Sequence, residues 1–296
     1  MAYLSVSAAR PMTALRCLAL LTLAVSAAGC RASGPVGNAP PDYAAGDTLL
    51  PHDAFVLASR VLGEPRPVNV YLPPGYATSD RRFPVLFMPD GGTTEDFPHV
   101  TATVDSMIAE GAMLPVVVVG IANTVRRRDL TPPTSVASDR EVAPVVGGAP
   151  AFRAFLRDEL MPEIARRYRT DGVTAIMGES LAGLFVVDTL FEQPGLFRTY
   201  IALDPSLWWD GGARVRAAPD WLAAHRTVSN ALYLASSDEP GIAQPVATLA
   251  AALQADAPPG LRWTSRPRPD LSHATIYRAT KRDALAWAFP RPTGPR

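Results

Sequence analysis

Cysteine is almost absent from this sequence of 296 residues. Its two cysteines, Cys17 and Cys30, both lie within the first thirty positions. Since neither lies in the rest of the chain, we expect a domain without an internal disulfide. The same scarcity excludes a metal centre built from thiolates. Stability must therefore come from a packed core, for which a hydrophobic content of 48% is sufficient.

The sequence also lacks an excess of charge of either sign. Its 28 Lys and Arg residues balance 28 Asp and Glu residues, and Lys281 is the only lysine. Nucleic-acid-binding proteins usually carry a basic patch, because they must neutralise phosphates. The composition therefore gives no reason to expect a nucleic acid as partner.

The apolar run near the start is too short to span a bilayer comfortably. It reads CLALLTLAVSAAGC over residues 17–30 and follows Arg10 and Arg16. A charged region, a short apolar region and small residues are typical of a signal peptide. The final SAAGC resembles a bacterial lipobox, although Ala27 stands where leucine is usual. We predict a lipoprotein-type signal peptide over residues 1–29 and an exported, periplasmic or cell-surface protein anchored to a membrane by lipid on Cys30. Free secretion is the alternative.

The next segment, residues 30–48, is rich in Gly, Pro and Ala and shows no periodicity. Such a composition is typical of a flexible tether. From about residue 49 short apolar runs alternate with helical patterns, so we expect one domain over residues 49–296. The runs at 82–92, 114–123, 172–178, 199–206, 231–239 and 261–267 are expected strands, and helices are expected at 95–111, 149–168, 180–194, 217–226, 243–255 and 277–289.

This alternation predicts an α/β fold with a doubly wound, mostly parallel sheet and helices on both faces. Residues 114–123 (LPVVVVGIAN) are almost wholly apolar and β-branched, as in a strand buried on both faces. In such sheets, functional sites form at the carboxyl ends of the strands. Polar residues that directly follow an apolar run are therefore the candidates for chemistry.

Ser180 is the strongest such candidate. The stretch AIMGESLAGLFVVDTL places Gly178-Glu179-Ser180-Leu181-Ala182 between an expected strand and an expected helix. A nucleophile elbow has the pattern Gly-x-Ser-x-Gly, because a strained turn needs small neighbours. Ala182 replaces the last glycine but is still small. The alternative is that Ser180 only caps the following helix.

A serine nucleophile needs a histidine base and an acid, which follow it in this order in the chain. His273 lies between the last expected strand and the last helix, whereas His225 ends a helix, where a cation is stable without a catalytic role. Asp238 and Glu239 follow the strand at 231–236, and either could orient the imidazole. Asp204, at the end of the preceding strand, is a third candidate for the acid.

Three further groups could line the site. The backbone N–H of Leu181 and that of Gly91 or Gly92 are the expected oxyanion donors. Trp208 and Trp209 could floor a substrate pocket or could be ordinary packing. The arginines at 126–128 could bind an anionic substrate or could clamp their loop through Asp129.

Taken together, several segments resemble the bacterial Putative esterase family, the branch of the α/β hydrolases that includes enterobactin esterases and esterase D. The elbow stands where the family shows Gly-His-Ser-x-Gly-Gly-Leu, and DPSLWWD resembles its Ser-Pro-Ser-x-Trp-Trp segment, with Asp204 in place of Ser. The resemblance covers about residues 50–290. It rests on FPVLFMPDGG, VVVVGIANTVRRRDLTPP, FLRDELMPEIARRY, GESLAGLF, DPSLWWD and LSHATIYRATKRDALAWAF.

The resemblance implies a serine ester hydrolase with Ser180 as nucleophile and His273 as base. It places the acid best at Glu239, one residue from Asp238. We expect a small-molecule ester as substrate and neither cofactor nor metal, because acyl transfer through serine needs none. Acyl transfer or thioester hydrolysis on the same scaffold is one alternative. A surface lipoprotein that binds a ligand without catalysis is another, and the Gly-to-Ala departure at Ala182 is its only support.

Overall fold

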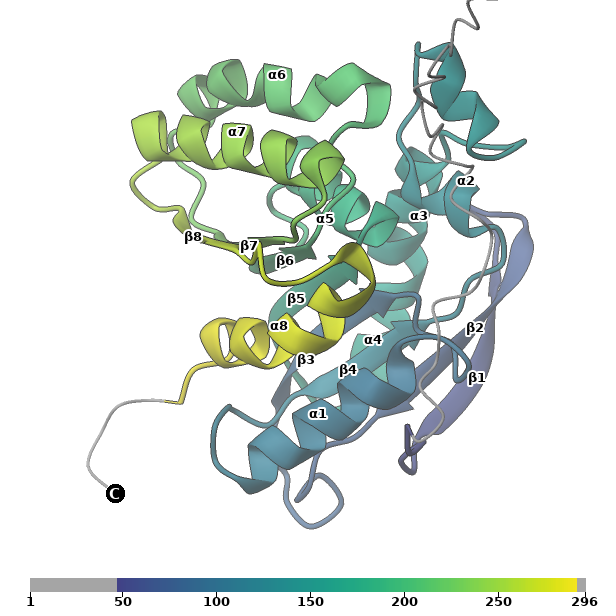
Figure 1. The fold of residues 1–296 in the computed structure, drawn as a ribbon. Helices are drawn as coiled ribbons and strands as arrows, with labels where there is room; N and C mark the ends of the chain where they lie inside the picture. Colours follow the sequence, from purple (N-terminus) through teal and green to yellow (C-terminus); the bar gives the residue numbers. More distant parts are fainter. Residues whose placement is uncertain (1–46, 292–296) are drawn as a thin grey trace, which may run out of the picture. The chain divides into compact units, whose positions relative to one another are not determined.

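The computed structural model describes residues 47–291. Its sheet has eight strands in the order β1-β2-β4-β3-β5-β6-β7-β8. The pairs β1–β2 and β2–β4 are antiparallel and all other neighbours are parallel, as predicted for a mostly parallel sheet (Figure 1). The strands are β1 (Asp53–Ser59), β2 (Glu64–Tyr71), β3 (Phe83–Pro89), β4 (Val117–Ile121), β5 (Thr170–Glu179), β6 (Thr199–Leu203), β7 (Ala231–Ser236) and β8 (Arg262–Pro267).

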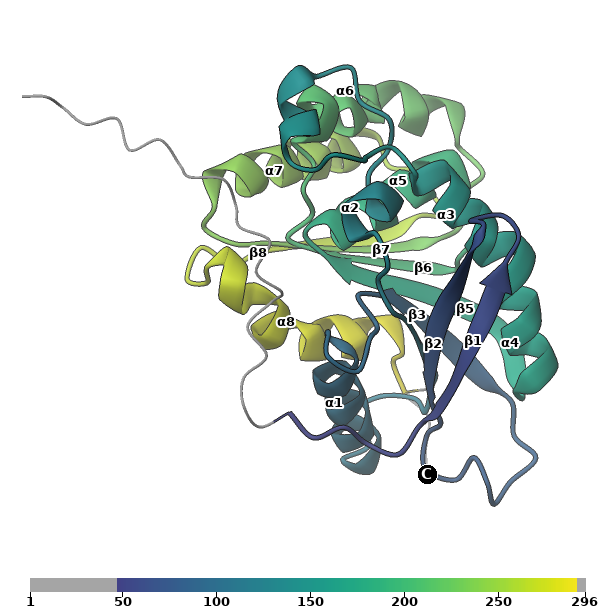
Figure 2. The same cartoon turned by 90° about the vertical axis from the view of Figure 1, so that its right-hand side faces the viewer.

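Helices cover both faces of the sheet, as the alternating pattern predicts (Figure 2). Helices α1 and α8 pack on one face, and the other long helices pack on the opposite face. Among residues 47–291, no helix is both long and apolar enough to cross a membrane. The helices are α1 (Phe97–Ala109), α2 (Arg126–Leu130), α3 (Ala149–Phe155), α4 (Met161–Arg167), α5 (Leu181–Glu192), α6 (Trp209–Ala224), α7 (Pro240–Asp256) and α8 (His273–Ala288).

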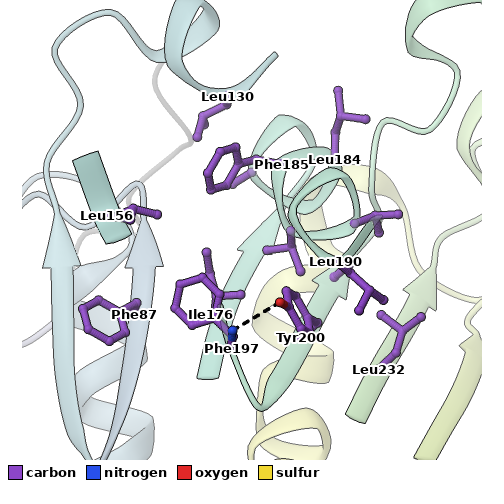
Figure 3. Packing of buried hydrophobic residues seen from close by; sticks show 14 of the residues in the cluster. Phe87, Leu130, Leu156, Ile176, Leu184, Phe185, Leu190, Phe197, Tyr200 and Leu232 are labelled. Atoms are coloured by element: carbon purple, nitrogen blue, oxygen red, sulfur yellow. Dashed lines mark hydrogen bonds between the residues drawn. The ribbon is translucent and has the colours of Figure 1, made fainter. Parts of the chain in front are cut away.

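The central strands are buried on both faces, which explains their unbroken apolar sequences. Because successive side chains alternate between faces, Ile176 and Tyr200 point into the core beneath α5, whereas Met177 and Ile201 point into the core beneath α1 and α8. Figure 3 shows the first of these cores, in which Phe185 of α5 lies above the sheet. Helix α5 is almost wholly buried, so it forms a rigid base for the residue that precedes it.

The helix expected over 149–168 is divided into α3 and α4 by a π-helical turn at Leu156–Leu160. Pro162 lacks the backbone N–H that an α-helix needs at this position. The N–H of Met161 donates to the carbonyl of Leu156, five residues back, which is the π-helical pattern. Helix α6 begins earlier than expected, because a kink with left-handed backbone at Asp210–Gly212 joins two helical pieces.

The predicted signal peptide and Cys30 lie outside the described residues, as does the predicted tether up to residue 46. Asp47, which falls within the predicted tether, is bound to the domain. Its carboxylate accepts two hydrogen bonds from the Arg278 guanidinium, at 3.0 and 2.5 Å. Contacts of the domain therefore begin two residues before the predicted boundary at residue 49.

Candidate active site

Three neighbouring strands end at one edge of the sheet on residues with left-handed backbone. Asp90 after β3, Ser180 after β5 and Asp204 after β6 have φ of 57°, 58° and 47°. A non-glycine residue in this region costs of the order of 1–3 kcal/mol, and such strain clusters at functional sites. The register of β5 and β6 pairs Glu179 with Leu203, so Ser180 and Asp204 lie next to each other. This edge carries the candidate site.

Ser180 stands on a tight corner between β5 and α5. A Cβ atom added to Gly178 would lie 2.6 Å from Ala182, so only glycine fits there. Ala182 itself is accommodated, and its departure from the Gly-x-Ser-x-Gly pattern leaves the corner intact. Ser180 is the N-cap of α5 by position, but its side chain makes no capping hydrogen bond. Its hydroxyl is thus available for another role.

That hydroxyl faces His273, the first residue of α8. The distance from Ser180 Oγ to His273 Nε2 is 3.2 Å. A capping box between Ser272 and Thr275 holds the start of the helix and so positions the imidazole. The His273 side chain is 38% exposed, so it can be reached from solvent.

The acid that contacts His273 is Asp204. Its Oδ2 lies 2.6 Å from His273 Nδ1. Asp204 is fully buried and also accepts hydrogen bonds from the backbone N–H and the hydroxyl of Ser237, at 2.6 and 2.7 Å. Three donors thus hold this buried carboxylate in place beside the imidazole.

The structure does not bring Asp238 or Glu239 into this position. Both are exposed, and within residues 47–291 neither is hydrogen-bonded to His273. The reason is the turn after β7: Ser237 points toward Asp204, and the chain then enters α7 with Glu239 as its N-cap. The third candidate from the sequence, Asp204, is therefore the one that the geometry supports.

Sequence reasoning missed Glu179, which also contacts the imidazole. Its Oε1 lies 3.4 Å from His273 Nδ1, and its side chain is 17% exposed. Burial raises the pKa of Glu179 to about 8, against the opposing charges of His273 and Arg126. The side chain is therefore mostly protonated at neutral pH. Its place as the residue before the nucleophile was the available signal.

The pKa of His273 results from opposing effects. Burial by itself lowers it, but the hydrogen bond from Nδ1–H to Asp204 raises it above the ordinary value of 6.5. A raised pKa marks an imidazole whose charged form is stabilised. This is the property that a general base needs when it accepts a proton during a reaction.

The predicted oxyanion donors differ in whether their N–H groups already have a hydrogen-bond partner. Leu181 is the first residue of α5, where backbone N–H groups have no partner within the helix. The N–H of Gly91 bonds to the carbonyl of Ile121 at 2.9 Å, which extends β3 along β4. The N–H of Gly92 bonds to Glu95 Oε2 at 2.7 Å. Both glycine amides are thus engaged, and Gly92 becomes a donor to a substrate only if Glu95 moves.

Ser206 is a second residue that sequence reasoning missed. Its buried hydroxyl lies 3.4 Å from Ser180 Oγ, and its N–H donates to the Ser180 carbonyl at 3.0 Å. It belongs to the DPS segment, two residues after Asp204. It therefore contacts the elbow through both its backbone and its side chain.

The two tryptophans differ in burial. Trp209 is 2% exposed, and its indole N–H donates to the Pro132 carbonyl at 3.0 Å, so it is core packing. Trp208 is half-buried and packs against Trp209 at a ring distance of 5.8 Å. Only Trp208 keeps the surface that a substrate could contact.

The arginines at 126–128 are all held by internal partners. Arg126 binds both oxygens of Asp90, at 2.6 and 2.8 Å, and Arg127 donates to the Val142 carbonyl. Arg128 binds Asp129 at 2.7 Å and also Glu64. The loop-clamp alternative thus describes this segment better than anion binding does.

The Glu179, Asp204 and His273 side chains could also be considered as metal ligands. Their donor atoms lie within 4.8 Å of one another. However, Asp204 and His273 already share a 2.6 Å hydrogen bond, and the Nδ1 proton occupies the space where a metal would bind. The trio fits a hydrogen-bonded acid–base chain better than a metal centre.

The family model described as "Putative esterase" matches residues 59–281. The ferri-bacillibactin esterase BesA of Bacillus subtilis is 39% identical over 111 residues, which cover 33% of this chain and 38% of that protein. The siderophore triacetylfusarinine C esterase of Aspergillus fumigatus is 39% identical over 90 residues, which cover 29% of each protein. The aligned part thus spans about a third of the length of these curated relatives.

Solved structures share the fold over most of the chain. The IroE-like serine hydrolase from Shewanella oneidensis is 28% identical and superposes with a TM-score of 0.73, covering 81% of this chain and 80% of that one. The BES protein from Bacillus cereus has a TM-score of 0.72 at 19% identity, covering 84% and 99% of the two chains. The predicted α/β-hydrolase architecture is confirmed.

Proposed function

Since this chain belongs to the Putative esterase family, we propose that it is a serine esterase that cleaves a carboxylic ester. The observation that carries the proposal is the hydrogen-bonded chain from Ser180 through His273 to Asp204, with distances of 3.2 and 2.6 Å. A hydroxyl, an imidazole and a buried carboxylate in this order form the constellation that activates serine as a nucleophile.

The proposed reaction begins with proton transfer from Ser180 Oγ to His273 Nε2. Oγ attacks the ester carbonyl, and Asp204 stabilises the imidazolium that forms. The N–H of Leu181 donates to the oxyanion, a contact worth roughly a hundred- to thousandfold in rate. His273 then returns the proton to the leaving alcohol, and an acyl group remains on Ser180.

Deacylation repeats these steps with water. His273 Nε2 takes a proton from a water molecule, whose oxygen attacks the acyl carbon. Collapse of the second tetrahedral intermediate releases the carboxylic acid and returns the proton to Ser180 Oγ. The residues regenerate themselves, so the cycle needs no cofactor.

The relatives support an ester of the siderophore class as the first candidate substrate. Two of them are named for the hydrolysis of ferri-bacillibactin and of triacetylfusarinine C. A siderophore ester is a small molecule, in keeping with a site at the exposed end of a sheet. Feruloyl, acetyl and short acyl esters are the other substrates to be compared.

Hydrolysis of p-nitrophenyl butyrate by the purified protein tests the proposal. We expect Ser180→Ala and His273→Ala each to lower kcat by at least about a thousandfold. Addition of alcohols or sugars as competing nucleophiles, with product analysis, would reveal acyl transfer. A fully active Ser180→Ala variant would contradict the mechanism, and ligand binding without turnover would indicate the non-catalytic lipoprotein.

A further inference from the structure

The turn that follows β6 contacts both members of the Ser180–His273 pair. Asp204, its first residue, accepts the Nδ1–H of His273, and Ser206 places its hydroxyl 3.4 Å from Ser180 Oγ. Ser206 is only 2% exposed, so bulk solvent does not hydrate its hydroxyl. Among residues 47–291, Ser180 Oγ is the one atom to which this hydroxyl is hydrogen-bonded. The proton transfers between Ser180 and His273 leave it without a role.

Main-chain hydrogen bonds set the position of Ser206. Its N–H donates to the Ser180 carbonyl at 3.0 Å, and the N–H of Ser180 donates to the Leu203 carbonyl at 3.1 Å. The Ser206 carbonyl accepts the N–H of Trp209 at 3.2 Å. None of these bonds uses the Ser206 hydroxyl, so the turn does not need that hydroxyl to keep its place beside the elbow.

The direction of the hydroxyl–hydroxyl hydrogen bond follows from the protons on His273. Nδ1 carries the proton donated to Asp204, so in the neutral imidazole Nε2 is an acceptor. The Ser180 proton therefore points to Nε2, 3.2 Å away. Ser180 Oγ has only lone pairs left for a second contact, and the donor must be Ser206. In this state the nucleophilic oxygen donates one hydrogen bond and accepts another.

This hydrogen bond gains strength only when Ser180 Oγ becomes charged. Its length of 3.4 Å exceeds the usual O–H···O distance of about 2.7–2.8 Å, so it is weak while both hydroxyls are neutral. As the Ser180 proton moves to His273, Oγ gains negative charge, and hydrogen bonds to charged acceptors are shorter and stronger. An interaction that is stronger in the transition state than in the ground state raises kcat.

We propose that Ser206 is a further catalytic residue, whose hydroxyl donates a hydrogen bond to Ser180 Oγ while that oxygen carries negative charge. It acts when Oγ attacks the ester carbonyl. It acts again in deacylation, when the bond from Oγ to the acyl carbon breaks and His273 returns the proton to Oγ. The Ser206 proton itself is not transferred. This inference rests on the proposed ester hydrolysis at Ser180 and adds one residue to it.

Ser206→Ala in the full-length protein tests the inference, because it removes the hydroxyl and keeps the N–H that binds Ser180. We expect kcat for p-nitrophenyl butyrate to fall at least about fivefold, with KM within about twofold of the parent. The loss should be smaller than the roughly hundred- to thousandfold of an oxyanion donor, since the charge on Oγ is transient. Labelling of Ser180 by a fluorophosphonate should slow by a similar factor.

The pH profile separates a contact with the nucleophile from an effect on the base. Ser206→Ala should lower the plateau of kcat/KM and leave its acidic limb in place, because the Ser206 side chain is hydrogen-bonded to Ser180 and not to His273. A limb that moves would show that Ser206 acts through the imidazole, which overturns the inference.

Two further variants exclude packing and stability as causes. Ser206→Cys fills the same space with a much weaker donor, so it should also lower kcat, by at least about threefold. Ser59→Ala removes another buried serine hydroxyl, which is hydrogen-bonded to Glu159 and Leu62 and lies four strand spacings from β5. It should destabilise the protein more than Ser206→Ala does and leave kcat unchanged.

The outcomes distinguish the inference from the proposed function. An active parent whose Ser206→Ala variant loses less than about fivefold in kcat overturns the inference and leaves ester hydrolysis in place. Parental activity in Ser206→Cys does the same, because it would assign the Ser206→Ala loss to packing. A folded parent that neither cleaves the ester nor is labelled at Ser180 overturns the proposed function and the inference with it.

Discussion

At the scale of single residues, the proposed chemistry depends on the imidazole of His273. Asp204 accepts its Nδ1–H at 2.6 Å, and this contact fixes the tautomer in which Nε2 faces Ser180. Glu179 lies at 3.4 Å but has a raised pKa, so at neutral pH it adds little negative charge. The two neighbouring acids thus differ: Asp204 accepts the Nδ1–H, whereas Glu179 is mostly protonated at neutral pH.

The first prediction distinguishes Asp204 from the acids after β7. Asp204→Asn should lower kcat for p-nitrophenyl butyrate by about a hundred- to ten-thousandfold, because the imidazole loses its orienting carboxylate. It should also move the acidic limb of the kcat/KM profile to lower pH, since the hydrogen bond that His273 donates to Asp204 is the largest of the interactions that raise the pKa of His273. Glu239→Gln and Asp238→Asn are the controls, with expected changes below about threefold. A larger effect of Glu239→Gln than of Asp204→Asn would favour Glu239, the acid that the family resemblance implies.

The second prediction concerns the buried carboxyl of Glu179. Its pKa is about 8 in the folded protein and 4.5 without the fold. A raised acid pKa means that the folded state binds the proton more tightly, so stability is full below pH 4.5 and falls as the pH rises to about 8. The loss is at most about 4–5 kcal/mol. Glu179→Gln should therefore raise the melting temperature by several degrees at pH 8.5 but not at pH 4.5.

Thermal unfolding followed by circular dichroism at both pH values makes the comparison. Glu163→Gln is a suitable control, because hydrogen bonds from Arg166 and Arg167 lower the pKa of Glu163 instead of raising it. An equal change in melting temperature at both pH values for Glu179→Gln would show that Glu179 does not titrate in this range.

At the scale of elements, the site is made by the ends of strands. Strands β3, β5 and β6 are neighbours in the sheet. Each is followed by a residue with left-handed backbone, namely Asp90, Ser180 and Asp204. The buried helix α5 and the capped start of α8 hold Ser180 and His273 at 3.2 Å. The placement of Ser180 depends on Gly178, a position at which a residue with a Cβ atom does not fit.

The third prediction tests one of these positions. Gly178→Ala should abolish most of the activity, because the new Cβ would lie 2.6 Å from Ala182 and displace the elbow. We expect a loss of at least about a hundredfold in kcat and a destabilisation of about 1–3 kcal/mol. Gly195→Ala is the matched control, since no atom lies within 4 Å of its added Cβ. Activity of Gly178→Ala within twofold of the parent would show that the elbow is not strained.

Sequence patterns predicted the elements better than the contacts between them. The apolar runs at 114–123 and 199–206 contain β4 and β6, and the run at 172–178 lies within β5, because strands buried on both faces have an unmistakable composition. The candidate nucleophile was predicted from the elbow motif, and the candidate base from the order of the triad residues in the chain. The acid could not be assigned in this way, because acidic residues follow both β6 and β7. Only the backbone turn after each strand decides which of these residues faces His273. The engaged amides of Gly91 and Gly92 also depend on the fold, through Ile121 and Glu95.

At the scale of the whole molecule, the net charge of zero conceals an uneven distribution. Acids lie at the carboxyl edge of the sheet, while arginines of α2 are bound by Asp90 after β3, Glu64 of β2 and Asp129 of their own helix.

The fourth prediction concerns where the protein works. We propose that residues 1–29 direct export and that lipid on Cys30 anchors the chain to a membrane. In bacterial cells producing the full chain, Cys30→Ala should move the protein from the membrane fraction to the soluble fraction with its esterase activity unchanged. Cys17→Ala is the control and should leave the protein in the membrane fraction. Retention of Cys30→Ala in the membrane would contradict the lipid anchor.

The most direct test of the account is whether Ser180 is an activated nucleophile. The purified protein would be treated with a fluorophosphonate, which reacts covalently with activated serines, and the modified peptide would be identified by mass spectrometry. We predict a single adduct on Ser180, formed at least about a hundredfold more slowly in His273→Ala. A folded protein that remains unlabelled, or that is labelled equally fast without His273, would contradict the proposed serine esterase.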